Sequence, residues 1–108
     1  MQGLIYICNT KMYTKDQILQ ILTREKVNLQ EKYPISELAL FGSFARGDNT
    51  MNSDIDILVD FSGKIDGFDF IKLAHHLEDS FKTKIDLVSR DGIKPKYLPF
   101  IEKNLIHV

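Results

Sequence analysis

The sequence contains one cysteine, Cys8, in 108 residues. A single cysteine excludes an internal disulfide and a cysteine-based zinc cluster, and it fits a reducing compartment. No apolar run approaches the ~20 residues that a membrane-spanning helix needs. The first residues, MQGLIYICNTK, also lack the basic leader and long apolar region of a signal peptide. These absences predict a cytoplasmic protein without a membrane partner.

The chain also lacks an excess of either charge, because its formal net charge is −1 and its pI is about 6.3. Broad nucleic-acid binding usually leaves a basic footprint, so direct binding to nucleic acid is not expected. There are no repeats, low-complexity segments or linkers, and the length suits one domain. We therefore expect a single domain over residues 1–108, in which residues 1–11 form an extra N-terminal strand or a tail, or lie upstream of a start at Met12.

Hydrophobic periodicity and turn residues give a coarse order of elements. Thr14 and Gln17 form a T-x-x-Q capping box, which predicts the start of a first helix. Apolar residues at helical spacing, or alternating at strand spacing, mark the remaining elements. The helices are expected at 14–31, 68–81 and 95–103, and the strands at 36–41, 55–61, 84–89 and 105–108.

Acidic residues stand in two of the strand-like runs. Successive side chains of a strand point to opposite faces, so Asp54 and Asp56 share one face while Ile55 and Ile57 occupy the other. In KIDLVS, Asp86 alternates in the same way, and it joins the pair if its strand lies beside the second strand. Carboxylates are natural ligands of Mg²⁺, and three on adjacent strands can hold two metal ions ~3.5–4 Å apart.

A phosphate-binding turn is predicted at the end of the first strand. Gly42-Ser43 leads from that strand into a turn of helix, which exposes backbone N–H groups that can bind phosphate. Gly42 permits close approach to the backbone, the Ser43 hydroxyl can donate a hydrogen bond, and Arg46 can hold phosphate oxygens in a forked pair.

These motifs together resemble the nucleotidyltransferase superfamily that includes DNA polymerase beta. Its signature is Gly-Ser, about ten residues, then Asp-x-Asp, with a third acid on a later strand. The GSxARG and SDIDxxV elements, here Gly42 to Gly47 and Ser53 to Val59, are closer still to the minimal nucleotidyltransferases, the MNT or MntA-like proteins. The resemblance covers roughly Thr14 to Leu105. It implies an α+β fold, in which helices pack on one face of a small mixed β-sheet.

The resemblance also implies an activity and a partner. Members transfer a nucleotidyl group from a nucleoside triphosphate, here ATP or another NTP, to a hydroxyl acceptor. Asp54, Asp56 and Asp86 would then be the catalytic residues and would hold two Mg²⁺ ions. Gly42, Ser43 and Arg46 would bind the phosphates. MNT proteins are typically antitoxins of HEPN-type toxins, and some transfer AMP to a tyrosine of the toxin.

Other interpretations stay open at this stage. Asp54 and Asp56 could be the solvent face of an edge strand, Asp86 a surface acid, and Arg46 a structural residue. The chain could neutralise a partner by contact alone, as a binding module without catalysis. It could also act on a small-molecule hydroxyl, although so short a chain would need a homo-oligomer to complete the acceptor site.

Overall fold

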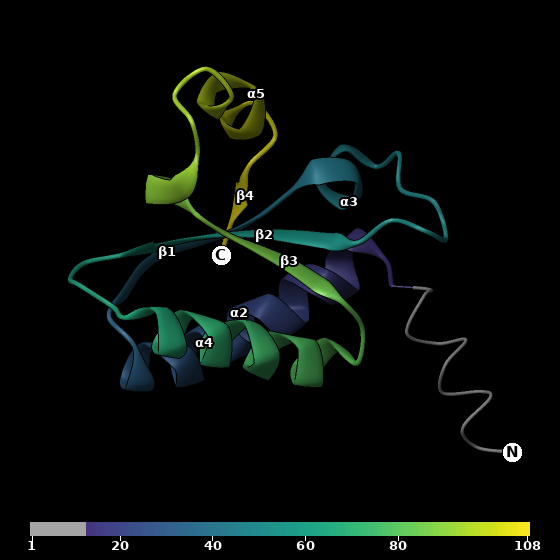
Figure 1. The fold of residues 1–108 in the computed structure, drawn as a ribbon. Helices are drawn as coiled ribbons and strands as arrows, with labels where there is room; N and C mark the ends of the chain where they lie inside the picture. The colour runs from purple at the N-terminus through teal and green to yellow at the C-terminus, as the bar shows by residue number, and fades with distance from the viewer. Residues whose placement is uncertain (1–12) are drawn as a thin grey trace, which may run out of the picture.

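The computed structural model describes residues 13–108, and the prediction for residues 1–11 lies outside them. Figure 1 shows the fold. The elements in chain order are α2 (Lys15–Lys32), β1 (Ile35–Phe41), α3 (Gly42–Arg46), β2 (Ile55–Phe61), α4 (Gly67–Phe81), β3 (Ile85–Ser89), the 3₁₀ helix η1 (Arg90–Gly92), α5 (Leu98–Glu102) and β4 (Ile106–His107). That a single domain spans the whole chain stays a prediction.

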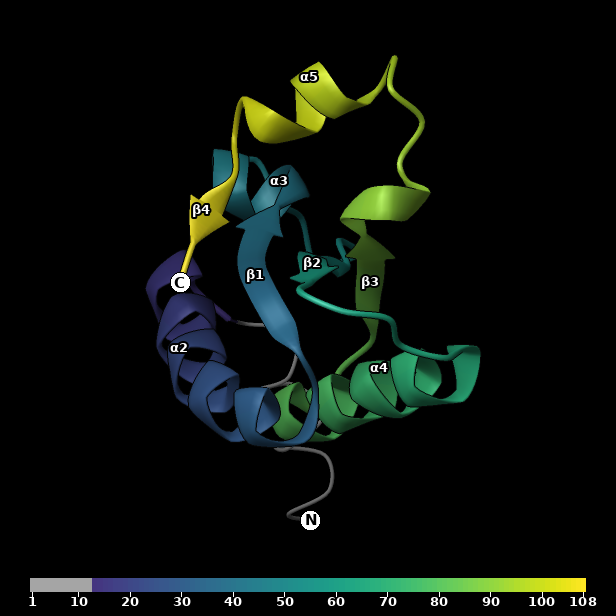
Figure 2. The ribbon, with the colours of Figure 1, turned by 90° about the vertical axis from the view of Figure 1, so that its left-hand side faces the viewer.

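The strands form one four-stranded sheet in the order β3-β2-β1-β4. Strand β1 runs antiparallel to β2 and to β4, and Figure 2 shows β1 and β4 pointing in opposite directions. Strands β2 and β3 are parallel. A parallel pair needs a crossover connection, and α4 supplies it. The predicted α+β fold with a mixed sheet is confirmed.

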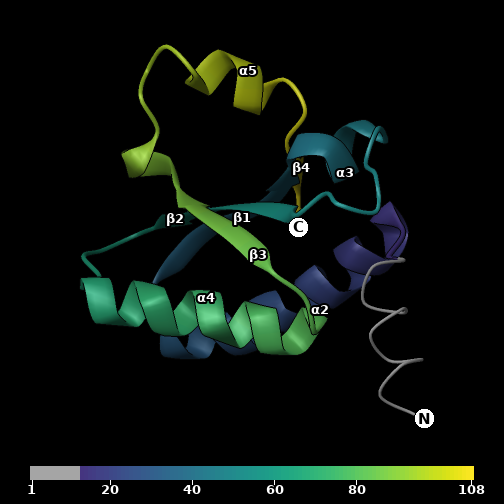
Figure 3. The same ribbon diagram turned by 45° about the vertical axis from the view of Figure 1, so that its right-hand side comes forward.

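The hydrophobic core lies between the sheet and the two long helices, α2 and α4, which cover the same face (Figures 1 and 3). Every second residue of β2 faces this core, and these residues are fully or almost fully buried. The core side chains from the helices and from β2 include Ile18, Leu22, Leu73, Leu77, Phe81, Ile55, Ile57 and Val59. Burial of these apolar side chains fixes which face of β2 points away from the core.

Local signals place both long helices. The amide of Gln17 donates to the Thr14 hydroxyl (3.1 Å) and the amide of Thr14 donates to the Gln17 side chain (2.9 Å), as the capping box predicts. Helix α4 begins one residue earlier than predicted. The Asp66 side chain caps it by accepting from the amide of Asp69 at 2.8 Å.

The opposite face of the sheet carries short elements only. Helix α3 and the segment from η1 to β4 lie on this side (Figures 1 and 3). Helix α5 spans Leu98–Glu102, shorter than the predicted helix over 95–103, because tight turns at Lys94–Tyr97 and Pro95–Leu98 precede it. No helix in the described part of the chain is long and apolar enough to cross a membrane.

Candidate active site

Strands β2 and β3 bring two of the predicted acids side by side. Asp56 pairs with Asp86 in the parallel register. Their neighbours Ile55, Ile57 and Ile85 face the core, so both carboxylates project from the opposite face. The predicted alternation and the predicted adjacency of the two strands are both confirmed.

The Asp56 carboxyl lies partly buried beside two other acids. Burial raises its pKa from 3.8 to about 6, and the charge of Asp86, a hydrogen bond with Asp86 and the charge of Asp54 act in the same direction. Arg46 opposes the rise, so its guanidinium lies within electrostatic reach of Asp56. The concentrated negative charge of oxygen donors suits a hard cation such as Mg²⁺, because a cation would relieve the repulsion.

Asp54 stands just before β2 and has a cationic neighbour. Lys84 Nζ lies 3.9 Å from Asp54 Oδ2. From the sequence, Lys84 is expected to belong to a solvated rim around the third strand, and its pairing with Asp54 has no local signal there. Among residues 13–108, no three His, Cys, Asp or Glu side chains already converge as a metal-binding group. Mg²⁺ usually keeps several waters and binds through one or two carboxylates, so it does not require a closed cage of protein ligands.

Gly42 joins the phosphate turn to the acids. Its φ is +76°, and a Cβ at this position would lie 2.0 Å from Asp56 Oδ2. The carboxylate of Asp56 therefore rests directly against the glycine, which explains why no side chain fits here. The cap residue before α3, Phe41, makes no side-chain hydrogen bond to the first turn, so the amides after Gly42 have no side-chain cap.

Arg46 lies at the end of α3, one turn after Ser43. Its Nε pairs with Asp48 Oδ2 at 3.1 Å, and both side chains are largely exposed. An exposed pair of this kind is worth little, about 0–1 kcal/mol, so the guanidinium can exchange Asp48 for a phosphate at small cost. The structure thus brings Gly42, Ser43 and Arg46 to the end of the sheet where Asp54 and Asp56 lie.

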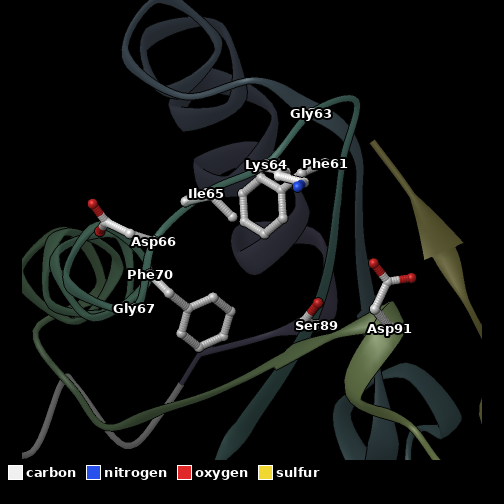
Figure 4. Close-up of a pocket in the computed structure, with 9 residues that line it drawn as sticks. All are labelled: Phe61, Gly63, Lys64, Ile65, Asp66, Gly67, Phe70, Ser89 and Asp91. Atoms are coloured by element: carbon white, nitrogen blue, oxygen red, sulfur yellow. The ribbon is translucent and has the colours of Figure 1, made fainter.

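A cavity of about 460 Å³ lies away from these residues, at the other ends of β2 and β3 (Figure 4). Its lining includes Phe61, Lys64, Phe70, Ser89 and Asp91. None of the predicted site residues lines it, so we assign it no part in the candidate active site.

Comparison with known proteins agrees with this geometry. A nucleotidyltransferase domain family matches residues 24–108. A candidate protein adenylyltransferase of Methanocaldococcus jannaschii is 43% identical over 98 residues, which cover 90% of this chain and 100% of the relative. Protein adenylyltransferase MntA of Thermococcus cleftensis is 34% identical over 97 residues, with 90% and 98% covered.

Solved structures show the same fold. A minimal nucleotidyltransferase superposes with a TM-score of 0.74 at 26% identity, covering 89% of this chain and 97% of the other. A toxin–antitoxin crystal structure with AMP-PNP gives a TM-score of 0.65 at 22% identity, with 88% and 72% covered. A complex of an AMPylated Shewanella oneidensis HEPN toxin with its MNT antitoxin gives 0.58 at 20% identity, with 86% and 66% covered. The chain belongs to the nucleotidyltransferase domain family and is a minimal, MntA-like nucleotidyltransferase.

Proposed function

We propose that the protein is an antitoxin that transfers AMP from ATP to a tyrosine hydroxyl of a HEPN-type toxin, with Mg²⁺ as cofactor. The observation that carries the proposal is the Asp56–Asp86 pair on adjacent parallel strands, with Asp56 in contact with the Gly42 turn. A binding module has no need for acids, a phosphate turn and an arginine on one surface.

The position of each residue suggests its role in binding phosphate or metal. The backbone after Gly42 and the Ser43 hydroxyl would hold the β- and γ-phosphates, and Arg46 would leave Asp48 to join them. Asp54, Asp56 and Asp86 would hold two Mg²⁺ ions. Bound there, the ions would stabilise the attacking and leaving oxygens of an in-line displacement.

The position of Asp86 sets the direction of attack. An in-line displacement requires the hydroxyl to reach the α-phosphate opposite the departing pyrophosphate. Helix α3 packs on β1 and β2, whereas Asp86 lies on the edge strand β3. The acceptor hydroxyl would therefore approach over β3 and lose its proton beside the Asp86 carboxylate, while pyrophosphate leaves on the α3 side.

The proposal that the acceptor is a HEPN-type protein is supported by the names of the relatives. The Thermococcus relative is named a protein adenylyltransferase, and a structural neighbour is complexed with an AMPylated HEPN toxin. Contact neutralisation without catalysis remains the alternative function, and it predicts that the acids are dispensable.

The test compares the wild type with the double variant Asp54→Asn/Asp56→Asn. A HEPN-type protein encoded beside the chain is incubated with α-labelled ATP and Mg²⁺, and label on its tyrosines is measured by mass spectrometry. We expect labelling by the wild type, none by the double variant, and intact complexes in both cases. The control is Asp60→Asn, which changes the same residue type farther along β2 and should label normally. Neutralisation by the double variant would favour the binding-module function.

A further inference from the structure

Lys84 lies beside the acids, although it stands just outside the strand that carries Asp86. It directly precedes β3, whose parallel register with β2 aligns Asp86 with Asp56. Continued back by two residues, the same register sets Lys84 opposite Asp54. Ile85 is 6% exposed and packs in the core, so both of its neighbours in the chain point to the face of the acids. The Lys84 ammonium therefore belongs to the candidate active site by its position.

The ion pair that Lys84 makes there is loose. Its Nζ lies 3.9 Å from Asp54 Oδ2, which is too long for a hydrogen bond. The side chains of Lys84 and Asp54 are 76% and 47% exposed. An exposed pair of this length contributes little to stability, so the fold does not depend on it. Because a lysine stem is long and flexible, the ammonium can also leave Asp54 at small cost.

The pair is nevertheless specific to the site. Within residues 13–108, it is the only ion pair that involves any of the three acids. Arg46 lies within electrostatic reach of Asp56, but its own ion pair is with Asp48. Lys84 is therefore the cation that partly neutralises Asp54 in the free protein, and a metal ion held by Asp54 would have to displace it or share the carboxylate with it.

A positive charge at this place has opposite effects on the two ligands of the site. It repels a bare divalent cation, and it attracts a nucleoside triphosphate. The complex of Mg²⁺ with a triphosphate still carries negative charge, so it too is attracted. Lys84 thus weakens binding of the metal ion alone and strengthens binding of the metal–nucleotide complex.

We propose that Lys84 is a specificity-determining residue that disfavours binding of Mg²⁺ alone to the acids and favours its entry together with the nucleoside triphosphate. This inference rests on the proposed function for the role of Mg²⁺ and for the nucleotide. Lys84 acts through its charge beside Asp54, and it needs no contact with the acceptor.

The test measures two affinities of the wild type and of Lys84→Gln, without any acceptor. Binding of Mn²⁺ alone is followed by electron paramagnetic resonance, because Mn²⁺ prefers the same oxygen ligands as Mg²⁺. Binding of a non-hydrolysable ATP analogue with Mg²⁺ is followed by calorimetric titration. From the loss of one charge next to the site, we expect Lys84→Gln to bind Mn²⁺ about threefold more tightly or better, and the Mg²⁺–analogue complex about threefold more weakly or worse.

Two further variants separate charge from other effects. Lys84→Arg keeps the positive charge and should restore both affinities to those of the wild type. Lys72→Gln makes the same change in net charge on an exposed position of α4, which covers the other face of the sheet (Figure 3). It should leave both affinities unchanged. Equal Tm values for all four proteins would show that none of the differences comes from unfolding.

The inference requires both changes in Lys84→Gln. Equal Mn²⁺ affinity in the variant and the wild type, including no measurable binding by either, would overturn it, and so would unchanged affinity for the Mg²⁺–analogue complex. Weaker Mn²⁺ binding by the variant would also overturn it, because that result would mean that Lys84 only holds Asp54 in place. None of these outcomes concerns transfer to the acceptor. Failure of the wild type to bind the analogue with Mg²⁺ would instead count against the proposed function.

Discussion

At the scale of single residues, Gly42 meets two separate constraints, a positive φ and contact with Asp56. Gly47 provides a comparison, because its φ is +86° but a Cβ there would have nothing within 4 Å. We predict that Gly42→Ala and Gly47→Ala both lose ~1 kcal/mol of stability from left-handed backbone strain. Only Gly42→Ala should also displace Asp56 and lower binding of a non-hydrolysable ATP analogue at least tenfold. Equal analogue affinity for the two variants would show that the contact with Asp56 is unimportant.

Asp56 is expected to lower the stability of the protein when no metal ion or nucleotide is bound. Its pKa in the folded protein is about 6, above the ordinary 3.8. The free energy of unfolding therefore falls as the pH rises from about 4 through 6, because the folded state resists ionisation of Asp56. We predict that Asp56→Asn raises the free energy of unfolding by about 1 kcal/mol at pH 8 in EDTA, allowing for partial exposure. The gain should vanish at pH 4. Urea unfolding at both pH values measures it, and a gain that persists at pH 4 contradicts the raised pKa.

At the scale of elements, Glu37 stabilises the connection between β1, η1 and β4, because its carboxylate pairs with Arg90 and His107, and we call these three residues the Arg90 network. Hydrogen bonding to Arg90 chiefly lowers its pKa from 4.5 to about 2. The contribution is fully present above pH 4.5 and is lost as pH falls toward 2. We predict that Glu37→Gln lowers the free energy of unfolding by ~2–3 kcal/mol at pH 7, because it leaves Arg90 partly unpaired. Glu31→Gln, on the exposed surface of α2, is the control and should stay within ~0.5 kcal/mol.

Elements with a regular pattern could be predicted from the sequence, and those held by distant charges could not. The strands start and end within two residues of prediction, because alternating burial specifies them. The same alternation placed Asp54, Asp56 and Asp86 on one face. Helix α5 was predicted too long, because the turns at Lys94–Tyr97 and Pro95–Leu98 occupy its expected first residues.

The Arg90 network had no local signal in the sequence. Glu37 and His107 are 70 positions apart, and Arg90 is 53 positions from Glu37, so no periodicity joins them. The contact between Gly42 and Asp56 was missed for a similar reason. The Gly-Ser motif indicated a turn near phosphate, whereas the packing of that turn on a carboxylate depends on the antiparallel pairing of β1 with β2.

At the scale of the whole molecule, the two faces of the sheet have opposite roles. One face buries the apolar core under α2 and α4, while the other collects the acids, α3 and the Arg90 network. A core variant and a site variant should therefore behave differently. Leu77→Ala is expected to cost ~2–5 kcal/mol of stability through the cavity it leaves, yet the folded fraction should bind nucleotide as the wild type does.

Nucleotide binding should stabilise the whole protein in proportion to its occupancy. At a concentration 100 times Kd, a non-hydrolysable ATP analogue with Mg²⁺ should add ~2.7 kcal/mol, enough to raise Tm by several degrees. The analogue alone should add much less, because Asp56 and Asp86 repel an unshielded triphosphate. Without ligand, the double variant Asp54→Asn/Asp56→Asn should have a higher Tm than the wild type. Its Tm should not rise when Mg²⁺ and the analogue are added. A calorimetric scan of both proteins with each ligand combination measures this reversal. An equal Mg²⁺-dependent shift in the double variant would mean that these acids do not form the metal site.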